Sequence, residues 1–158
     1  MADDSIPFTP EGFAELTIEL KRLKDEERPK VITEIAEARA HGDLRENAEY
    51  HAAREKQGFI EARIKDLEAG LSRAKVIDFR GESVDQVRIG AYITLIDEET
   101  GDERSYRIVG DLESDITKGK ISMSSPIAKA VLGKTLNDLV EVKVPKGVVE
   151  YQVAKIHY

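Results

Sequence analysis

The chain has 158 residues, with 24 lysines and arginines against 31 aspartates and glutamates, and its net charge of −7 argues against a protein that coats DNA. There is no cysteine, which excludes a disulfide framework, a thiolate zinc site and a cysteine nucleophile. The N-terminal segment is acidic and no apolar run approaches the ~20 residues that span a bilayer, so we expect a cytoplasmic protein without a leader or a membrane partner.

Apolar residues at coiled-coil spacing predict two helical arms between Thr9 and about Ala74. In each arm they recur three or four residues apart: Phe13, Leu16, Leu20 and Leu23 in the first, and Ile60, Ile64, Leu67 and Leu71 in the second. If the arms pair antiparallel in a constant register, Leu16 faces Leu71 and the turn falls at Asp43–Leu44, beside Gly42. Arms of about thirty residues at 1.5 Å per residue form a rod on the order of 45 Å long.

Prolines mark two positions in the first arm. Thr9 and Pro10 provide an N-cap and a first-turn proline, which predict where the helix begins. Pro29 lies inside the arm, where it removes a helical hydrogen bond and is expected to bend the rod. Beyond it the predicted seam changes to small residues, with Ile35 facing Ala52.

After Lys75 the apolar period changes to two, which predicts strands. Alternation occurs in three runs: Ile89, Ala91, Ile93 and Leu95; Val140, Val142 and Val144; and Val149, Tyr151 and Val153. Ser125–Pro126 opens a short helix over Ile127–Leu132, which Gly133 ends. The sequence therefore predicts an α+β fold, with an antiparallel coiled-coil hairpin in residues 1–76, its tip at 41–47, and an antiparallel sheet with one helix in residues 77–158.

The predicted turn between the arms carries two carboxylates, Asp43 and Glu46, whose spacing allows two interpretations. In the first they form a capping box, in which Asp43 caps the second arm and Glu46 reaches back to it. In the second, two carboxylates at the end of a long rod share a divalent cation with a partner. Carboxylate oxygens suit Mg²⁺, but two on one short segment hold it weakly, so the partner would supply the remaining ligands.

Three segments carry a resemblance to a known family: residues 35–39 (IAEAR), residues 42–55 (GDLRENAEYHAARE) and residues 121–130 (ISMSSPIAKA). They resemble the bacterial Gre transcript cleavage factors, and the resemblance extends from Phe8 to the C-terminus. It implies that the hairpin enters the secondary channel of RNA polymerase and that an FKBP-like second domain docks at the channel rim. The docking residues that it implies are Ser124, Ser125 and Pro126.

The two tip acids of the Gre family match Asp43 and Glu46, and the resemblance implies that these residues take part in catalysis. They would help to hold a second Mg²⁺ shared with the polymerase, with none bound by the free protein, and Glu46 would orient or deprotonate the attacking water. The polymerase would hydrolyse the 3′ end of its own backtracked RNA. The protein is thus expected to be a monomeric catalytic accessory, not an enzyme, that restarts arrested transcription.

Four further residues are predicted to contact RNA or to support the tip: Arg45, Asn47, Tyr50 and Arg54. Arg54 matches a basic position of the family motif, and Asn47 is expected to support the turn through side-chain hydrogen bonds. The alternatives are that the arginines are solvated, as charges on a coiled-coil flank usually are, and that Tyr50 packs over the second helix.

Three other functions are weighed against transcript cleavage. A family member with an altered tip would block the channel without cleaving RNA, whereas Asp43 and Glu46 are both intact here. An FKBP-like half could be a prolyl isomerase, but such a pocket is expected to be lined by aromatic residues and this half has few of them and no tryptophan. A structural spacer would function without Asp43.

Overall fold

The computed structural model describes residues 4–158 and forms two units. Ala14–Arg73 is one unit, and the residues up to Phe13 join Ala74–Tyr158 in the other. We call them the hairpin unit and the globular unit. Residues 1–3 of the predicted 1–76 segment lie outside the described residues. The N-terminal segment therefore groups with chain that follows the hairpin, which the periodicity of the sequence did not indicate.

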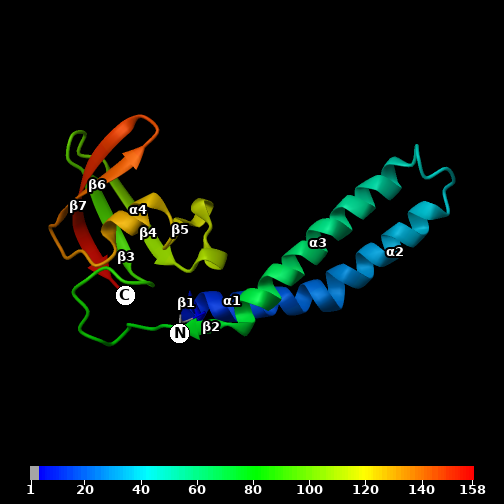
Figure 1. Cartoon of the computed structure of the whole chain (residues 1–158), viewed down its shortest axis with the longest axis horizontal. Helices are drawn as coiled ribbons and strands as arrows, with labels where there is room; N and C mark the ends of the chain where they lie inside the picture. The colour runs from blue at the N-terminus through cyan, green and yellow to red at the C-terminus, as the bar shows by residue number, and fades with distance from the viewer. Residues whose placement is uncertain (1–3) are drawn as a thin grey trace. The chain divides into compact units, whose positions relative to one another are not determined.

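The first arm of the hairpin is a succession of three helical segments, and the second arm is one helix (Figure 1). They are α1 (Pro10–Arg22), η1 (Leu23–Glu27) and α2 (Arg28–Arg39), followed by α3 (Ala48–Ser72). As predicted, Thr9 caps α1, because its hydroxyl accepts the Gly12 N–H at 3.1 Å. The 25 residues of α3 span about 37 Å at 1.5 Å per residue. Among residues 4–158, no helix combines the length and the apolar character needed to cross a membrane.

A π-helical turn, η1, precedes Pro29. The Arg28 N–H bonds to the carbonyl of Leu23, five residues back, instead of four. Proline has no N–H to donate and its ring collides with the carbonyl four residues before it in a regular helix, so a wider turn accommodates Pro29 near the start of α2. The wider turn adds one residue to the first arm.

The added residue changes which alanine of the second arm is buried. The predicted pairing of Ile35 with Ala52 is wrong, because Ala52 is exposed and Ala53 is buried with Ile35 in the hairpin core. This shift by one residue matches the one-residue insertion at η1. The hairpin core consists of Val31, Ile35, Ala53, Ile60 and Ile64, with Leu20, Leu23 and Tyr50 packed against it.

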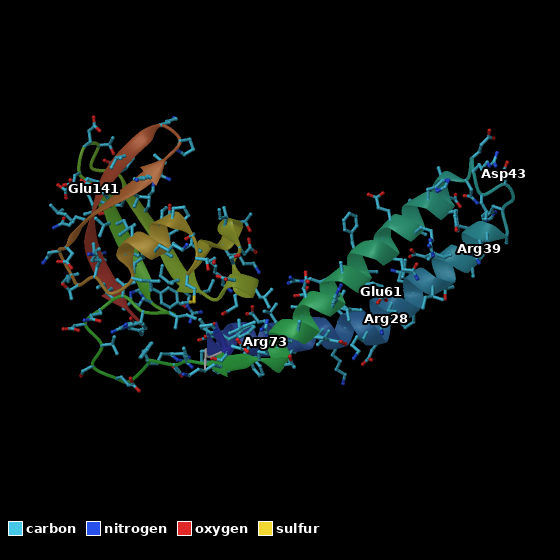
Figure 2. The ribbon with its side chains drawn as sticks, in the orientation of Figure 1. Arg28, Arg39, Asp43, Glu61, Arg73 and Glu141 are labelled. Carbon is cyan, nitrogen blue, oxygen red and sulfur yellow. The ribbon has the colours of Figure 1, made fainter. Side chains whose placement is uncertain are left out.

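Ion pairs join the two arms beside this core. Arg28 donates to both carboxylate oxygens of Glu61 at 2.8 and 2.9 Å, a pair labelled in Figure 2. Arg63 binds Glu19 in the same two-bond manner at 2.9 and 3.1 Å. These side chains are partly exposed, so each pair adds little stability, but the two-bond geometry favours one alignment of the arms.

The globular unit contains a five-stranded sheet and a two-stranded one. The larger has the order β5-β4-β3-β7-β6, and the smaller pairs β1 with β2. The strands are β1 (Ile6–Phe8), β2 (Ala74–Val76), β3 (Tyr92–Asp97), β4 (Glu103–Val109), β5 (Lys120–Ser122), β6 (Leu139–Val144) and β7 (Gly147–His157). The predicted α+β class is confirmed. The larger sheet is nevertheless mixed, because β5 runs parallel to β4 while the other pairs are antiparallel.

The parallel pairing of β5 follows from the connection before it. Between β4 and β5 the chain forms two 3₁₀ turns, η2 (Asp111–Glu113) and η3 (Ile116–Lys118), and re-enters the sheet in the direction of β4. A tight hairpin turn would have reversed the strand. Helix α4 (Pro126–Val131) follows β5, and its buried Ala128 and Val131 join the apolar core of the sheet (Figure 1).

Candidate functional site

The turn between α2 and α3 carries both predicted tip acids. Gly42 has φ +122°, which other residues rarely adopt, and the chain reverses after it. The carboxylate of Asp43 accepts the Arg45 N–H at 2.9 Å within the turn, and Figure 2 shows Asp43 at this end of the hairpin. Asp43 and Glu46 are exposed. They share an open hollow lined by His41, Asp43, Glu46, Asn47, Ala48 and Glu49.

Asn47, not Asp43, caps α3, so the capping-box interpretation is wrong. The side-chain oxygen of Asn47 accepts the Tyr50 N–H at 3.0 Å, and its amide nitrogen donates to the carbonyl of Ala38 at the end of α2. Asn47 therefore joins the end of one arm to the start of the other. The carboxylates of Asp43 and Glu46 both lie in the turn before the cap, and the cap does not need either of them.

Tyr50 and Arg54, both predicted near the tip, lie on α3 together with His51. Tyr50 is half-buried against the hairpin core, with the Arg39 guanidinium 5.7 Å from its ring centre. His51 donates from Nε2 to the carbonyl of Arg45 at 3.2 Å, which ties the turn to the first turn of α3. Arg54 is exposed and donates to Gln57 at 3.3 Å on its own helix.

The donor set at the tip fits a shared metal better than a resident one. In residues 4–158 no three histidine, aspartate or glutamate side chains come together as a metal site. Asp43 and Glu46 both line one open hollow, and their side chains carry carboxylate oxygens, the donor type that Mg²⁺ prefers. Since Mg²⁺ commonly takes one or two protein carboxylates and completes its six ligands elsewhere, these residues fit a cation whose other ligands come from a partner.

The segment from Ser122 to Pro126 joins β5 to α4, and we call it the 122–126 turn. Ser125 caps α4 by accepting the Ala128 N–H at 3.3 Å, and Pro126 is the first helical residue, as the sequence predicts. Ser124 donates its hydroxyl hydrogen bond to Asp111, 2.8 Å from Oδ1 and 3.0 Å from Oδ2. Asp111 is not predictable from the sequence, because it lies thirteen positions from Ser124 and no local pattern links the two residues.

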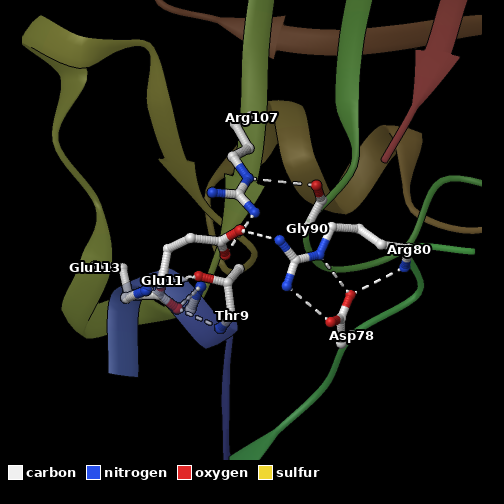
Figure 3. A network of polar contacts seen from close by, with 9 residues as sticks. Thr9, Glu11, Asp78, Arg80, Gly90, Arg107 and Glu113 are labelled. Atoms are coloured by element: carbon white, nitrogen blue, oxygen red, sulfur yellow. Dashed lines mark hydrogen bonds and ion pairs between the residues drawn. The ribbon is translucent and has the colours of Figure 1, made fainter. Parts of the chain in front are cut away.

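A second polar network holds the N-terminal segment within the globular unit (Figure 3). Glu113 accepts hydrogen bonds from the backbone N–H groups of Thr9 and Gly110, at 2.9 and 3.0 Å, and from the Thr9 hydroxyl. Thr9 is fully buried. A Cβ at Gly12 would lie 1.6 Å from the Glu113 carboxylate, so a larger residue there would displace Glu113 from these hydrogen bonds. This network was not predictable from local patterns, because Thr9 and Glu113 are 104 positions apart in the chain.

Arginines lower the pKa of two carboxyls in the same region. Hydrogen bonds from the Arg80 side chain and backbone hold the pKa of Asp78 at about 2, below its ordinary 3.8. Burial acts to raise the pKa of Glu11, but its own backbone N–H, then Arg107 and Arg80, lower it below the ordinary value. Arg107 binds Glu11 at 3.0 Å and Arg80 binds it at 3.1 Å, so both carboxylates are held as anions.

Two family models match nearly the whole chain. The one described as "Transcription elongation factor, N-terminal" matches residues 6–76, and the one described as "Transcription elongation factor, GreA/GreB, C-term" matches residues 82–158. Among solved structures, the GreA factor homolog 1 (Gfh1) of Thermus thermophilus is 30% identical, with 98% of this chain and 99% of that chain covered and a TM-score of 0.44.

Curated relatives match over almost their full length. The transcription elongation factor GreA of Phenylobacterium zucineum (strain HLK1) is 52% identical over 98% of this chain and 99% of the relative. Its counterpart in Rickettsia bellii (strain OSU 85-389) is 56% identical over 96% of this chain and 94% of the relative. The predicted resemblance is thus confirmed, and the chain belongs to the GreA/GreB family of transcription elongation factors.

Proposed function

We propose that this protein stimulates the hydrolysis of backtracked RNA by bacterial RNA polymerase. In this proposal the hairpin tip enters the secondary channel of the polymerase and brings Asp43 and Glu46 to its active site. One observation carries the proposal: Asn47 makes the hydrogen bonds that cap α3, so Asp43 and Glu46, which precede Asn47 in the turn, are exposed and not needed for the cap. The protein acts as an accessory in the cytoplasm, and the polymerase is the nuclease.

In this proposal the two carboxylates share one task, and Glu46 has a second. Asp43 and Glu46 provide oxygen ligands for a Mg²⁺ ion that the polymerase also binds, and the other ligands come from the polymerase and the RNA. When bound, this ion supplies activation of a water nucleophile or stabilisation of the leaving oxygen, as in two-metal sites. Glu46 would also orient the attacking water by accepting its hydrogen bond, and would take its proton as a general base.

Neighbouring residues complete the proposed site. Asn47 and His51 fix the turn to both arms, so the acids lie on a defined segment. Arg45 and Arg54, both exposed, are proposed to approach the phosphates of the extruded RNA, while Tyr50 keeps its place against the hairpin core. The 122–126 turn, with Ser124, Ser125 and Pro126, is proposed to dock at the rim of the polymerase channel.

The test uses polymerase halted in a backtracked complex with 3′-labelled RNA and Mg²⁺. Wild-type protein should release short 3′ fragments, and Asp43→Asn or Glu46→Gln should slow release by roughly 100-fold or more, while polymerase binding is unchanged. Glu55→Gln is the matched control, because it removes the same charge from an exposed position on α3 away from the turn. Binding without cleavage by the wild type would favour a channel blocker, and absence of binding would refute the proposal.

A further inference from the structure

The carboxylate of Asp111 binds the two serines that flank Met123. It accepts the Ser122 hydroxyl through Oδ1 and the Ser124 hydroxyl through both oxygens, at 2.8 and 3.0 Å. The Ser122 hydroxyl in turn accepts the Ser124 N–H at 3.0 Å. One carboxylate on η2 thus fixes both sides of the bend by which the chain leaves β5 for α4.

Asp111 belongs to η2, which is also bound to the N-terminal segment through Glu113. Glu113, two residues further along η2, accepts hydrogen bonds from Thr9 and from Gly110 at 2.9 and 3.0 Å. At Gly110, a Cβ would lie 2.3 Å from the carbonyl oxygen of Pro7, so the backbones are in close contact there. Because η2 is anchored in this way, Asp111 provides a fixed point for the 122–126 turn.

We infer that Asp111 is a positioning residue for polymerase docking: it holds Ser124, Ser125 and Pro126 in the conformation that binds the channel rim. This inference rests on the proposed function. Hydrogen bonds to a charged acceptor are stronger than those between neutral groups, so one carboxylate that accepts two hydroxyls can order a short exposed turn. Without Asp111 the turn would sample other conformations, and docking would be weaker because the turn would have to become ordered on binding.

Loss of the Asp111 carboxylate should weaken docking without changing the maximal rate of RNA cleavage. With the full-length protein in the cleavage assay, Asp111→Ala should raise the half-saturating concentration about tenfold. The maximal cleavage rate at saturation should equal that of the wild type, because the tip acids are untouched. Asp115→Ala is the matched control: the Asp115 carboxylate accepts the Thr117 N–H at 3.1 Å and the Thr117 hydroxyl on η3, so its side-chain hydrogen bonds stay within η3.

Asparagine at position 111 distinguishes positioning from a direct charge contact. Its side-chain oxygen can still accept both serine hydroxyls, which each reach Oδ1, but as a neutral and weaker acceptor, so Asp111→Asn should raise the half-saturating concentration clearly less than Asp111→Ala does. If Asp111→Asn weakens docking as much as Asp111→Ala, the charge acts directly on the polymerase and positioning is refuted.

A double-mutant cycle provides the second test. Ser124→Ala should weaken docking, and Asp111→Ala should add little in that background, because both changes break the same contact. Full additivity would refute the inference, as would an Asp111→Ala protein that docks like the wild type. These outcomes leave the proposed function intact, whereas a wild-type protein that neither binds nor cleaves would refute both. Thermal unfolding of every variant checks that the fold is retained.

Discussion

Asn47 makes the two hydrogen bonds that close the hairpin tip, one to each arm. Asn47→Ala should destabilise the hairpin unit by about 1 kcal/mol or slightly more, because a lost N-cap costs roughly 0.5–2 kcal/mol. Hydrogen exchange of the Tyr50 amide and urea unfolding followed by circular dichroism would measure the effect. Asn47→Asp separates the two bonds, since aspartate still caps Tyr50 but has no amide to donate to Ala38. An alanine variant as stable as the wild type would show that the cap is dispensable.

The ion pair between Asp78 and Arg80 makes the stability of the fold depend on pH. The folded pKa of Asp78, about 2, is below its unfolded value, so this carboxylate stabilises the fold above pH 3.8 and its contribution is lost as pH falls toward 2. Arg80→Ala should raise the pKa of Asp78 toward 3.8, because the side-chain hydrogen bonds disappear while the backbone N–H remains. Titration of the carboxyl groups by NMR measures the pKa of Asp78 in both proteins. Asp138 is the internal control, because its pKa is lowered by hydrogen bonds from Thr135 and should not change.

At the scale of elements, α3 offers a matched pair of apolar positions. Ile64 is 2% exposed in the hairpin core, and Phe59 on the same helix is 69% exposed. Ile64→Ala should reduce the free energy of unfolding by roughly 2–5 kcal/mol, whereas Phe59→Ala should change it by less than about 0.5 kcal/mol. Chemical denaturation measures both. Equal effects would show that the exposed Phe59 ring stabilises the fold as much as the buried Ile64 side chain does.

Elements were predictable from the sequence where a local pattern determines them. The apolar period indicated the arms, and the alternation indicated β3, β6 and β7, because burial on one face imposes a fixed spacing. Two departures arise from interactions that spacing does not record. The π-helical turn before Pro29 moved the buried alanine from Ala52 to Ala53, and the route through η2 and η3 made β5 parallel to β4.

The candidate site was predictable in part for the same reason. Asp43 and Glu46 were located by the register of the arms together with the glycine, and their motif identified the family. Their relation to the helix cap was not determined, because Asp43 and Asn47 are both good caps and only the folded turn selects Asn47. Asp111 could not be found, since its partner Ser124 is brought to it by the parallel pairing of β5 with β4.

At the scale of the whole molecule, the globular unit is assembled from two separate stretches of chain. A fragment of residues 77–158 lacks Phe8 and Thr9, both fully buried in the intact protein. It should therefore be less stable than a protein in which a short glycine-serine linker joins Phe13 to Ala74, by at least the roughly 3–5 kcal/mol typical of losing a buried phenylalanine. Thermal unfolding of the two proteins is the measurement. Equal stability would show that the N-terminal segment is only an accessory to this unit.

The separation of Thr9 from Glu113 also sets an order of events during synthesis. At about 5–20 residues per second, a ribosome needs roughly 5–20 seconds to add the 104 positions between them. The hairpin is a contiguous stretch whose arms can pair within about a millisecond of emergence, by comparison with other helical proteins rich in local contacts. The hairpin therefore folds first on the nascent chain. Thr9 can bind Glu113 only after more than two thirds of the 158 residues have been made, when β6 and β7 have not yet been synthesised.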